Sequence, residues 1–245
     1  MITGDTKGIQ YSGGPDFLDF SDVMDVFGDL GIDTLVSGWL SVYDPLGLMG
    51  GAFDSIFGGD SKLVGQGIRI EGGNIADLAE SVDAYAYQDV SVKKNIFDDY
   101  DTYRDYQDLG SEAEIQIALV FDSLITAVAT GADALGVSEA EINAAINSFE
   151  VATTDIELKD LTPDEQAAEL EAYFSDIFND LSAAVIPWIE DFQQAGEELG
   201  ETMGRVATEV AVFDVLVRDL GVSMSSQDLD PQAYAEAADN LTMLT

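Results

Sequence analysis

Cysteine and histidine are both absent from this chain of 245 residues. Without cysteine, disulfides, thiolate nucleophiles, zinc–thiolate sites and iron–sulfur clusters are excluded. Without histidine, Ser-His-Asp and Cys-His triads, zincin motifs and histidine-ligated haem are excluded as well. The sequence contains no G-x-G-x-x-G, Walker or G-x-S-x-G pattern, and in a chain with 48 acids a neighbouring pair of carboxylates carries little information. We therefore expect no enzymatic activity, no cofactor and no metal site.

Positive charge is scarce. Nine Lys and Arg residues stand against 48 Asp and Glu, so the formal net charge is −39. Apolar residues make up 47% of the chain, which is enough to bury a core and is not the composition of a disordered acidic tail. A field of this sign repels phosphate backbones, so we expect no direct nucleic-acid binding. A salty habitat and a selected acidic surface both account for the charge.

The N-terminal part lacks a long uncharged apolar run. Residues 32–59 are apolar but interrupted by glycines and aspartates, and no window reaches the roughly 18 uncharged residues of a spanning helix. Such a segment does not form its own core, so we expect it to pack on another chain, with a membrane surface as the alternative. The candidate contacts are its large apolar side chains: Trp39, Leu40, Leu46, Leu48, Met49, Phe53, Ile56 and Phe57. No signal peptide is visible at the start of the chain.

A small β portion is expected over residues 68–96. Apolar and polar residues alternate over Ile68–Ile70 and again over 84–92, which is typical of strands, with one or two helical turns between them. Residues 97–110 are an acidic aromatic stretch that fails the EF-hand spacing, because Arg104 stands where glycine belongs. We interpret that stretch as a solvated loop, with a loose cation site as the alternative.

Helices are expected in the second half of the chain. Apolar spacing predicts a long helix over 111–136 and a shorter one ending near Phe149, each opened by a serine with an acid three residues on. A strand is expected over 151–158. Thr162, Pro163 and Glu165 then begin another helix, which Pro187 kinks or ends.

The helix after Gly200 carries an a/d-like seam. Its apolar side chains recur at steps of 3, 4, 3, 4 and 3: Met203, Val206, Val210, Phe213, Val217 and Leu220. We expect this seam to be an oligomer interface; an ordinary packed helix is the alternative, because the pattern covers little more than two heptads. Arg205 opens the seam and is expected to pair with Glu201, Glu209 or a neighbouring chain's acid. A solvated surface arginine is the alternative.

Several stretches, in order, resemble one protein family. Ser61–Ile70 looks like a transition from a basic spacer into a strand, and Tyr85–Val90 with Lys93-Lys94 looks like Tyr-x-Asp-Val-x-x-Lys-Lys. Ile156–Glu165 resembles the junction Ile-Asp-Leu-Lys-Gly-Leu-x-x-x-Glu. Residues 187–207 resemble Pro…Phe-Gln-x-x-Gly-Glu…Glu-Thr-Leu-x-Arg-Val-Ala. Together these stretches resemble the C-terminal region of tail tape measure proteins of long, non-contractile-tailed bacteriophages.

The chain departs from the family pattern at three points. Asp160 stands where the family junction often has glycine, Glu198 stands where a second glycine follows, and Lys62 is alone where the spacer is usually basic. These departures affect local turn geometry.

The resemblance implies a structural virion protein at the distal end of the tail. In such proteins a long helical stretch sets tail length and the C-terminal region anchors at the tip, usually as three copies. The resemblance therefore implies a homotrimer that contacts tail tube, distal tail and hub proteins, plugs the tube until DNA ejection, and is in the host cytoplasm during assembly. One helix of 245 residues would span only about 370 Å, so we expect the anchor region without its ruler.

Two other functions remain as alternatives. One is a membrane-active ejection protein that forms or lines a DNA channel in the host envelope, and the other is a soluble helical protein of a halophile. The expected fold is mainly α with a small β portion, an α+β protein with helical segments around a short antiparallel sheet, assembled as an axial homotrimer. The expected regions are an apolar segment packing on partners, strands with the long helix, a kinked helical part with the seam, and a tail: 1–67, 68–160, 161–221 and 222–245.

Overall fold

The computed structural model describes residues 61–93, 100–219 and 230–242. Within them, 58% of residues are helical and 23% lie in strands, which confirms the α+β prediction. All eight candidate partner or membrane contacts between Trp39 and Phe57 lie outside the described residues, as do Lys94 and Leu220.

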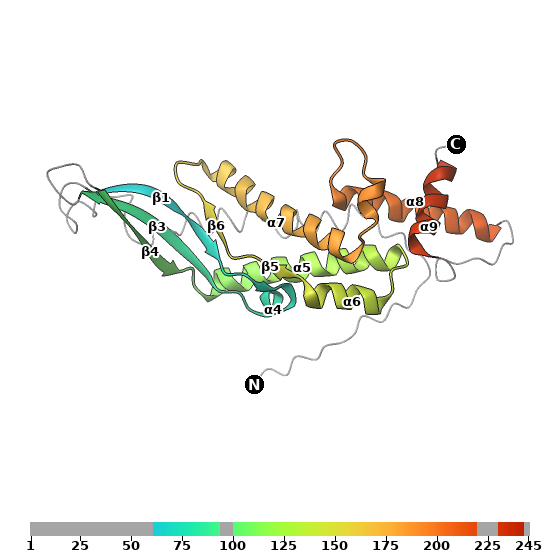
Figure 1. The fold of residues 1–245 in the computed structure, drawn as a ribbon, viewed down its shortest axis with the longest axis horizontal. Helices are drawn as coiled ribbons and strands as arrows, with labels where there is room; N and C mark the ends of the chain where they lie inside the picture. The colour runs from blue at the N-terminus through green and yellow to red at the C-terminus, as the bar shows by residue number, and fades with distance from the viewer. Residues whose placement is uncertain (1–60, 94–99, 220–229, 243–245) are drawn as a thin grey trace, which may run out of the picture.

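A four-stranded antiparallel sheet forms the β portion (Figure 1). Its order is β4-β3-β1-β6, with β1 at Ser61–Ile70, β3 at Ala84–Lys93, β4 at Tyr100–Asp108 and β6 at Thr154–Glu157. The β3 prediction is confirmed, and the strand predicted over Ile68–Ile70 is the C-terminal end of β1, which begins seven residues earlier at Ser61. Strand β1 runs across the expected region boundary between residues 67 and 68.

The loop prediction for residues 97–110 is wrong, because β4 occupies most of that stretch. Its residues pair with β3 along the whole length from Tyr85 to Lys93. The strand is polar or aromatic on both faces and is exposed nearly throughout, so it lacks the one-sided apolar alternation by which a strand is recognised. Tyrosine and threonine favour extended backbone, and pairing to β3 supplies the rest.

Shorter elements join the sheet to the helices. Strands β2 (Gly73–Asn74) and β5 (Glu150–Val151) pair with each other, and α4 (Ile75–Glu80) follows β2. The single strand expected over residues 151–158 is therefore two strands in two sheets, β5 and β6.

Four long or medium helices and a 3-10 turn build the rest: α5 (Ser111–Ala134), α6 (Glu139–Ser148), α7 (Pro163–Val185), η2 (Ile189–Phe192) and α8 (Leu199–Asp219), with α9 (Pro231–Thr242) after them. The capping boxes of α6 and α7 are confirmed, since Ser138 and Thr162 exchange hydrogen bonds with the acids three residues on. The box predicted for α5 is wrong: Gly110 is the N-cap and Ser111 lies inside the helix. Helix α7 ends two residues before Pro187.

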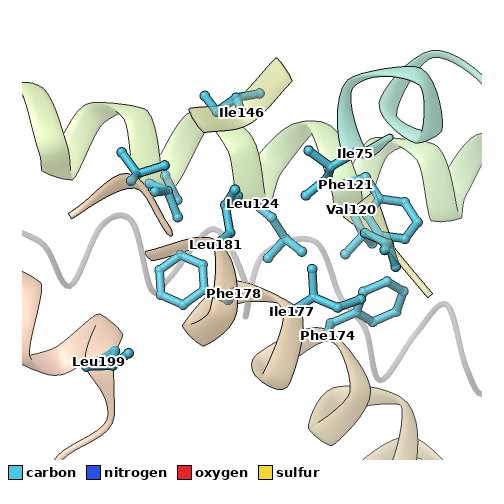
Figure 2. Close-up of a cluster of buried hydrophobic side chains, with 14 of the residues drawn as sticks. Ile75, Val120, Phe121, Leu124, Ile146, Phe174, Ile177, Phe178, Leu181 and Leu199 are labelled. Carbon is cyan, nitrogen blue, oxygen red and sulfur yellow. The ribbon is translucent and has the colours of Figure 1, made fainter. Parts of the chain in front are cut away.

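One core runs from the sheet through the helices, and Figure 2 shows its helical part. Helix α7 places Phe174, Ile177 and Leu181 against Phe121 and Leu124 of α5, and the Phe121 and Phe174 rings meet edge to face at 5.7 Å. Ile68 and Ile70 extend this core into the sheet. Helices do not surround the sheet: the far halves of β1, β3 and β4 project beyond the helical body as a three-stranded arm (Figure 1).

Candidate functional site

The predicted seam of α8 faces the inside of its own chain. Met203, Val206 and Val210 are buried within the single chain. A Cβ at Gly131 of α5 would lie 2.5 Å from the Met203 Sδ, so Met203 packs directly against the α5 backbone. These three side chains are thus covered already and are unavailable to a second copy in this fold.

The C-terminal part of the seam contacts α9. Phe213 packs edge to face on the buried Tyr234, with ring centroids 5.1 Å apart. Val217 lies within α8, but its side chain is outside the described part of the chain. Helix α9 supplies the partner that an a/d pattern needs, so the pattern does not by itself require another chain.

Arg205 is the centre of an ion-pair cluster beside this seam. Its Nε donates to Glu197 Oε1 at 3.0 Å and its Nη1 to Glu209 Oε1 at 3.2 Å. Its Nη2 donates to Glu197 Oε2 at 3.2 Å and to the Phe192 carbonyl at 2.5 Å, and Asp239 of α9 lies 3.8 Å from Nη1. Arg205 is only 22% exposed, so the surface-arginine alternative is wrong.

The predicted pairing of Arg205 with Glu209 is confirmed, whereas Glu201 instead accepts from the Glu198 backbone N–H at 3.2 Å. The strongest partner, Glu197, was missed. It lies eight residues before Arg205, outside the spacing of neighbours on one helix, and only the turn between η2 and α8 brings it close. The same glutamate also accepts from Thr202 Oγ1 at 3.0 Å and the Gln194 N–H at 3.1 Å.

Because of this cluster, the free energy of unfolding depends on pH in the acid range. The hydrogen bonds from Arg205 lower the pKa of Glu197 to about 2, from 4.5. A carboxylate with a depressed folded pKa contributes stability that is present above about pH 4.5 and is lost as pH falls toward 2. As pH falls between these values, the urea concentration at the midpoint of unfolding should decrease. We expect this decrease to be smaller for Glu197→Gln than for the unsubstituted protein, measured in parallel urea titrations. Equal slopes for the two proteins would contradict the assignment.

A second polar cluster covers the face of the sheet opposite the core. Asp155 of β6 accepts from two arginines, from Arg69 Nη1 at 3.0 Å and from Arg104 Nη1. Arg104 also holds Asp89 with two hydrogen bonds of 2.7 Å and stacks over the Tyr87 ring, with its Cζ 4.2 Å from the centroid. The cluster therefore ties β4, β3, β1 and β6 together across one face.

Each end of this cluster has further partners. Arg69 Nε donates to Glu71 at 2.7 Å, and the Tyr87 hydroxyl donates to Glu157 at 3.3 Å. Burial, with the negative charge of Glu157, raises the pKa of Tyr87 to about 12, so the phenol stays protonated as a donor. The arginines of the cluster donate their hydrogen bonds to acids within it, and these acids outnumber the arginines. The cluster therefore stabilises the sheet and does not offer a site for an anion.

The described arginines are all paired within the chain. Each of the arginines whose side chain is described, Arg69, Arg104 and Arg205, is committed to acids of the same chain. In the same part of the chain, no group of three or more acids is arranged to hold a metal ion. By length and composition α5 could cross a membrane, but half of its most apolar window is buried in the core, as in the core helix of a compact protein.

Large apolar side chains are exposed at a few places on the described surface. Three lie on the projecting arm, Val64 of β1 and Tyr100 and Tyr103 of β4, and Tyr106 of β4 lies in the row where β6 joins the sheet. Ile115 and Leu119 form a pair one turn apart on α5, and Val212 lies on α8. Strands β1 and β4 therefore carry more than half of these side chains.

No protein-family model, no curated protein and no solved structure matches this chain.

Proposed function

We propose that the chain is a structural component of a phage tail, the C-terminal tip part of a tape measure protein. In this role it anchors at the distal end of the tail, contacts tube and hub proteins, and closes the tube until DNA is ejected. The protein acts by assembly and carries out no reaction.

The observation that carries the proposal is the contact network inside the most specific stretch of the family resemblance. Phe192, Glu197 and Arg205, which that pattern sets at fixed spacings, form one interlocked unit through the Phe192 carbonyl and the Glu197 carboxylate. Gly196 between them has φ +88°, a left-handed conformation that favours glycine. The side-chain pairing of Glu197 with Arg205 is a physical reason for these two residue types to keep this spacing, whereas Phe192 contributes a backbone carbonyl that any residue would supply.

A departure from the family pattern also has a physical explanation. Asp160 has φ +61°, the only non-glycine residue with positive φ in the described part of the chain, and it stands where the family junction often has glycine. The backbone between β6 and α7 turns left-handed here, which glycine adopts without cost and which aspartate tolerates better than most residues. The same turn thus suits both residues.

The charge fits a position on the path of DNA. With the described arginines paired internally, the acids have few cations to offset them, and three copies would carry 3 × −39, or −117. A surface of this sign repels the phosphate backbone and would let DNA pass without binding it.

Mass spectrometry of purified particles tests the proposal. We expect peptides of this chain in intact virions at a few copies per particle, and fewer of them after ejection is triggered in vitro. Antibody labelling is expected at the end of the tail away from the head. Particles that lack the chain while the cell lysate contains it would contradict the proposal.

A further inference from the structure

Neither edge of the projecting arm is covered along its length by another described strand. Strand β4 is the outer strand of the sheet, with β3 on one side and no described strand on the other. On the opposite edge, β6 pairs only with Gly67–Ile70 of β1, and the loop after it reaches Gln66, where the Leu158 N–H donates to the Gln66 carbonyl at 2.7 Å. Residues Ser61–Gly65, the open β1 edge, thus have no described strand beside them. An unpaired edge is a template for another strand.

The two open edges differ in charge. The open β1 edge contains Lys62 and no acid of its own, and the Glu157 carboxylate of β6 lies at its inner end, where it accepts from the Gln66 N–H at 2.9 Å. Strand β4 contains three aspartates and Arg104, whose guanidinium is turned to Asp89 and Asp155 of the same sheet. The outer end of the open β1 edge thus carries one cation, whereas β4 carries a net charge of −2, so the two edges differ in sign.

Apolar exposure is concentrated on the same edges. Tyr100 and Tyr103 are 55% and 59% exposed, and Val64 is 44% exposed. Val64 sits at a bulge: Leu63 pairs with Val90 and Gly65 with Asp89, which leaves Val64 without an opposite residue. Bulges often protect an edge, but protective edges usually carry charged side chains, whereas this bulge presents valine.

We propose that the open β1 edge of one copy pairs with β4 of a second copy of this chain. The pairing joins a basic edge with Val64 to an acidic edge with exposed tyrosines, so charge and apolar surface are complementary. This inference rests on the proposed function, in which several copies assemble. It assigns the contact between copies to the strand edges of the arm, because the α8 seam is buried within its own chain.

The topology sets the direction of the new pair. Strand β4 is antiparallel to β3, and β3 is antiparallel to β1, so β4 and β1 run in the same direction. A rotation about an axis along the strands preserves that direction, so β4 and the neighbouring β1 pair in parallel. Because the contact is head to tail, a ring of copies can close and leave no open edge on the arm.

Pairing of two β4 strands is disfavoured by the same observations. It would bring two acidic edges together, each with a net charge of −2 from Asp101, Asp105, Asp108 and Arg104, and like charges on adjacent strands repel. The acids of β4 thus select against self-pairing and in favour of the basic edge.

Single-cysteine variants test the contact, because the chain has no cysteine of its own. Val64→Cys protein is mixed with Tyr100→Cys or Tyr103→Cys protein and treated with a short bismaleimide. We expect a cross-linked dimer in at least one mixture and none from any variant alone. Leu119→Cys, at another exposed apolar position but on α5, is the matched control and is expected to give no dimer with Val64→Cys.

A charge variant tests the same contact without cross-linking. Val64→Glu puts an acid on the edge that faces β4, and we expect association to weaken about tenfold or more in sedimentation equilibrium, with unchanged circular dichroism. Asp105→Lys in the same chain is expected to restore association, whereas Leu119→Glu is expected to leave it unchanged.

Three results would overturn the inference: a wild-type monomer at every salt concentration, association of Val64→Glu equal to wild type, or cross-linking of Tyr103→Cys to itself alone. None of them bears on whether the chain is present in virions, so failure here is distinct from failure of the proposed function.

Discussion

Arg205→Met is expected to lower the free energy of unfolding by about 2 kcal/mol, because it leaves two partly buried carboxylates without their cation. The side chains of Glu197 and Glu209 are 15% and 13% exposed, so water replaces little of what the guanidinium supplies. The Phe192 carbonyl loses a donor as well. Methionine keeps most of the volume and apolar stem, so the loss reports the charge and its hydrogen bonds.

Urea unfolding followed by circular dichroism at neutral pH measures this loss. The control is the double variant Arg205→Met with Glu197→Gln, which we expect to recover part of the stability because one orphaned charge is removed. An unfolding midpoint for Arg205→Met equal to that of the parent protein would mean that the cluster contributes nothing and that Arg205 behaves as a surface residue.

Gly67→Ala is expected to cost about 3 kcal/mol, through overpacking of the sheet. A Cβ at Gly67 would lie 1.9 Å from the Ile156 carbonyl oxygen and 2.8 Å from the Tyr87 hydroxyl oxygen. The first of these atoms is backbone in the neighbouring strand and cannot rotate away, so β6 must move off β1. Loss of β6 would also withdraw Asp155 from Arg69 and Arg104.

Gly73→Ala is the matched control for this substitution. A Cβ at Gly73 would meet only Leu78 Cδ2 at 3.8 Å, an ordinary contact, so we expect a change of less than about 1 kcal/mol. Thermal unfolding of both variants beside the parent protein makes the comparison. Equal melting temperatures for the two variants would contradict the close approach of β1 and β6 at Gly67.

The helices could be predicted from the sequence where local chemistry decides them. Thr162, Pro163 and Glu165 contain the whole start of α7, since the cap, the first helical residue and the reciprocal acid lie within four positions. The alternating residues of β3 were equally clear. The helix start at Gly110 was missed by one residue, because Ser111 and Glu114 have the spacing of a capping box without its geometry.

Strand β4 and the Arg205–Glu197 pair could not be predicted in this way. Strand β4 has no apolar face, and its extended state depends on hydrogen bonds to β3. Glu197 reaches Arg205 only because the η2–α8 turn folds back on the helix, and no periodicity relates two residues on either side of a turn.

The sequence alone determined which chemistries the missing cysteine and histidine exclude, the excess of acids, and where helices such as α7 begin. Each of these depends on residue type or on neighbours within one helical turn. The partner of each apolar face was decided only by the tertiary structure. The same 3,4 spacing serves an interchain seam or an intrachain core, and in this fold α5 and α9 cover it. With that seam buried, the strand edges of the arm are the surface we propose for assembly, since no described strand pairs with their outer backbone groups.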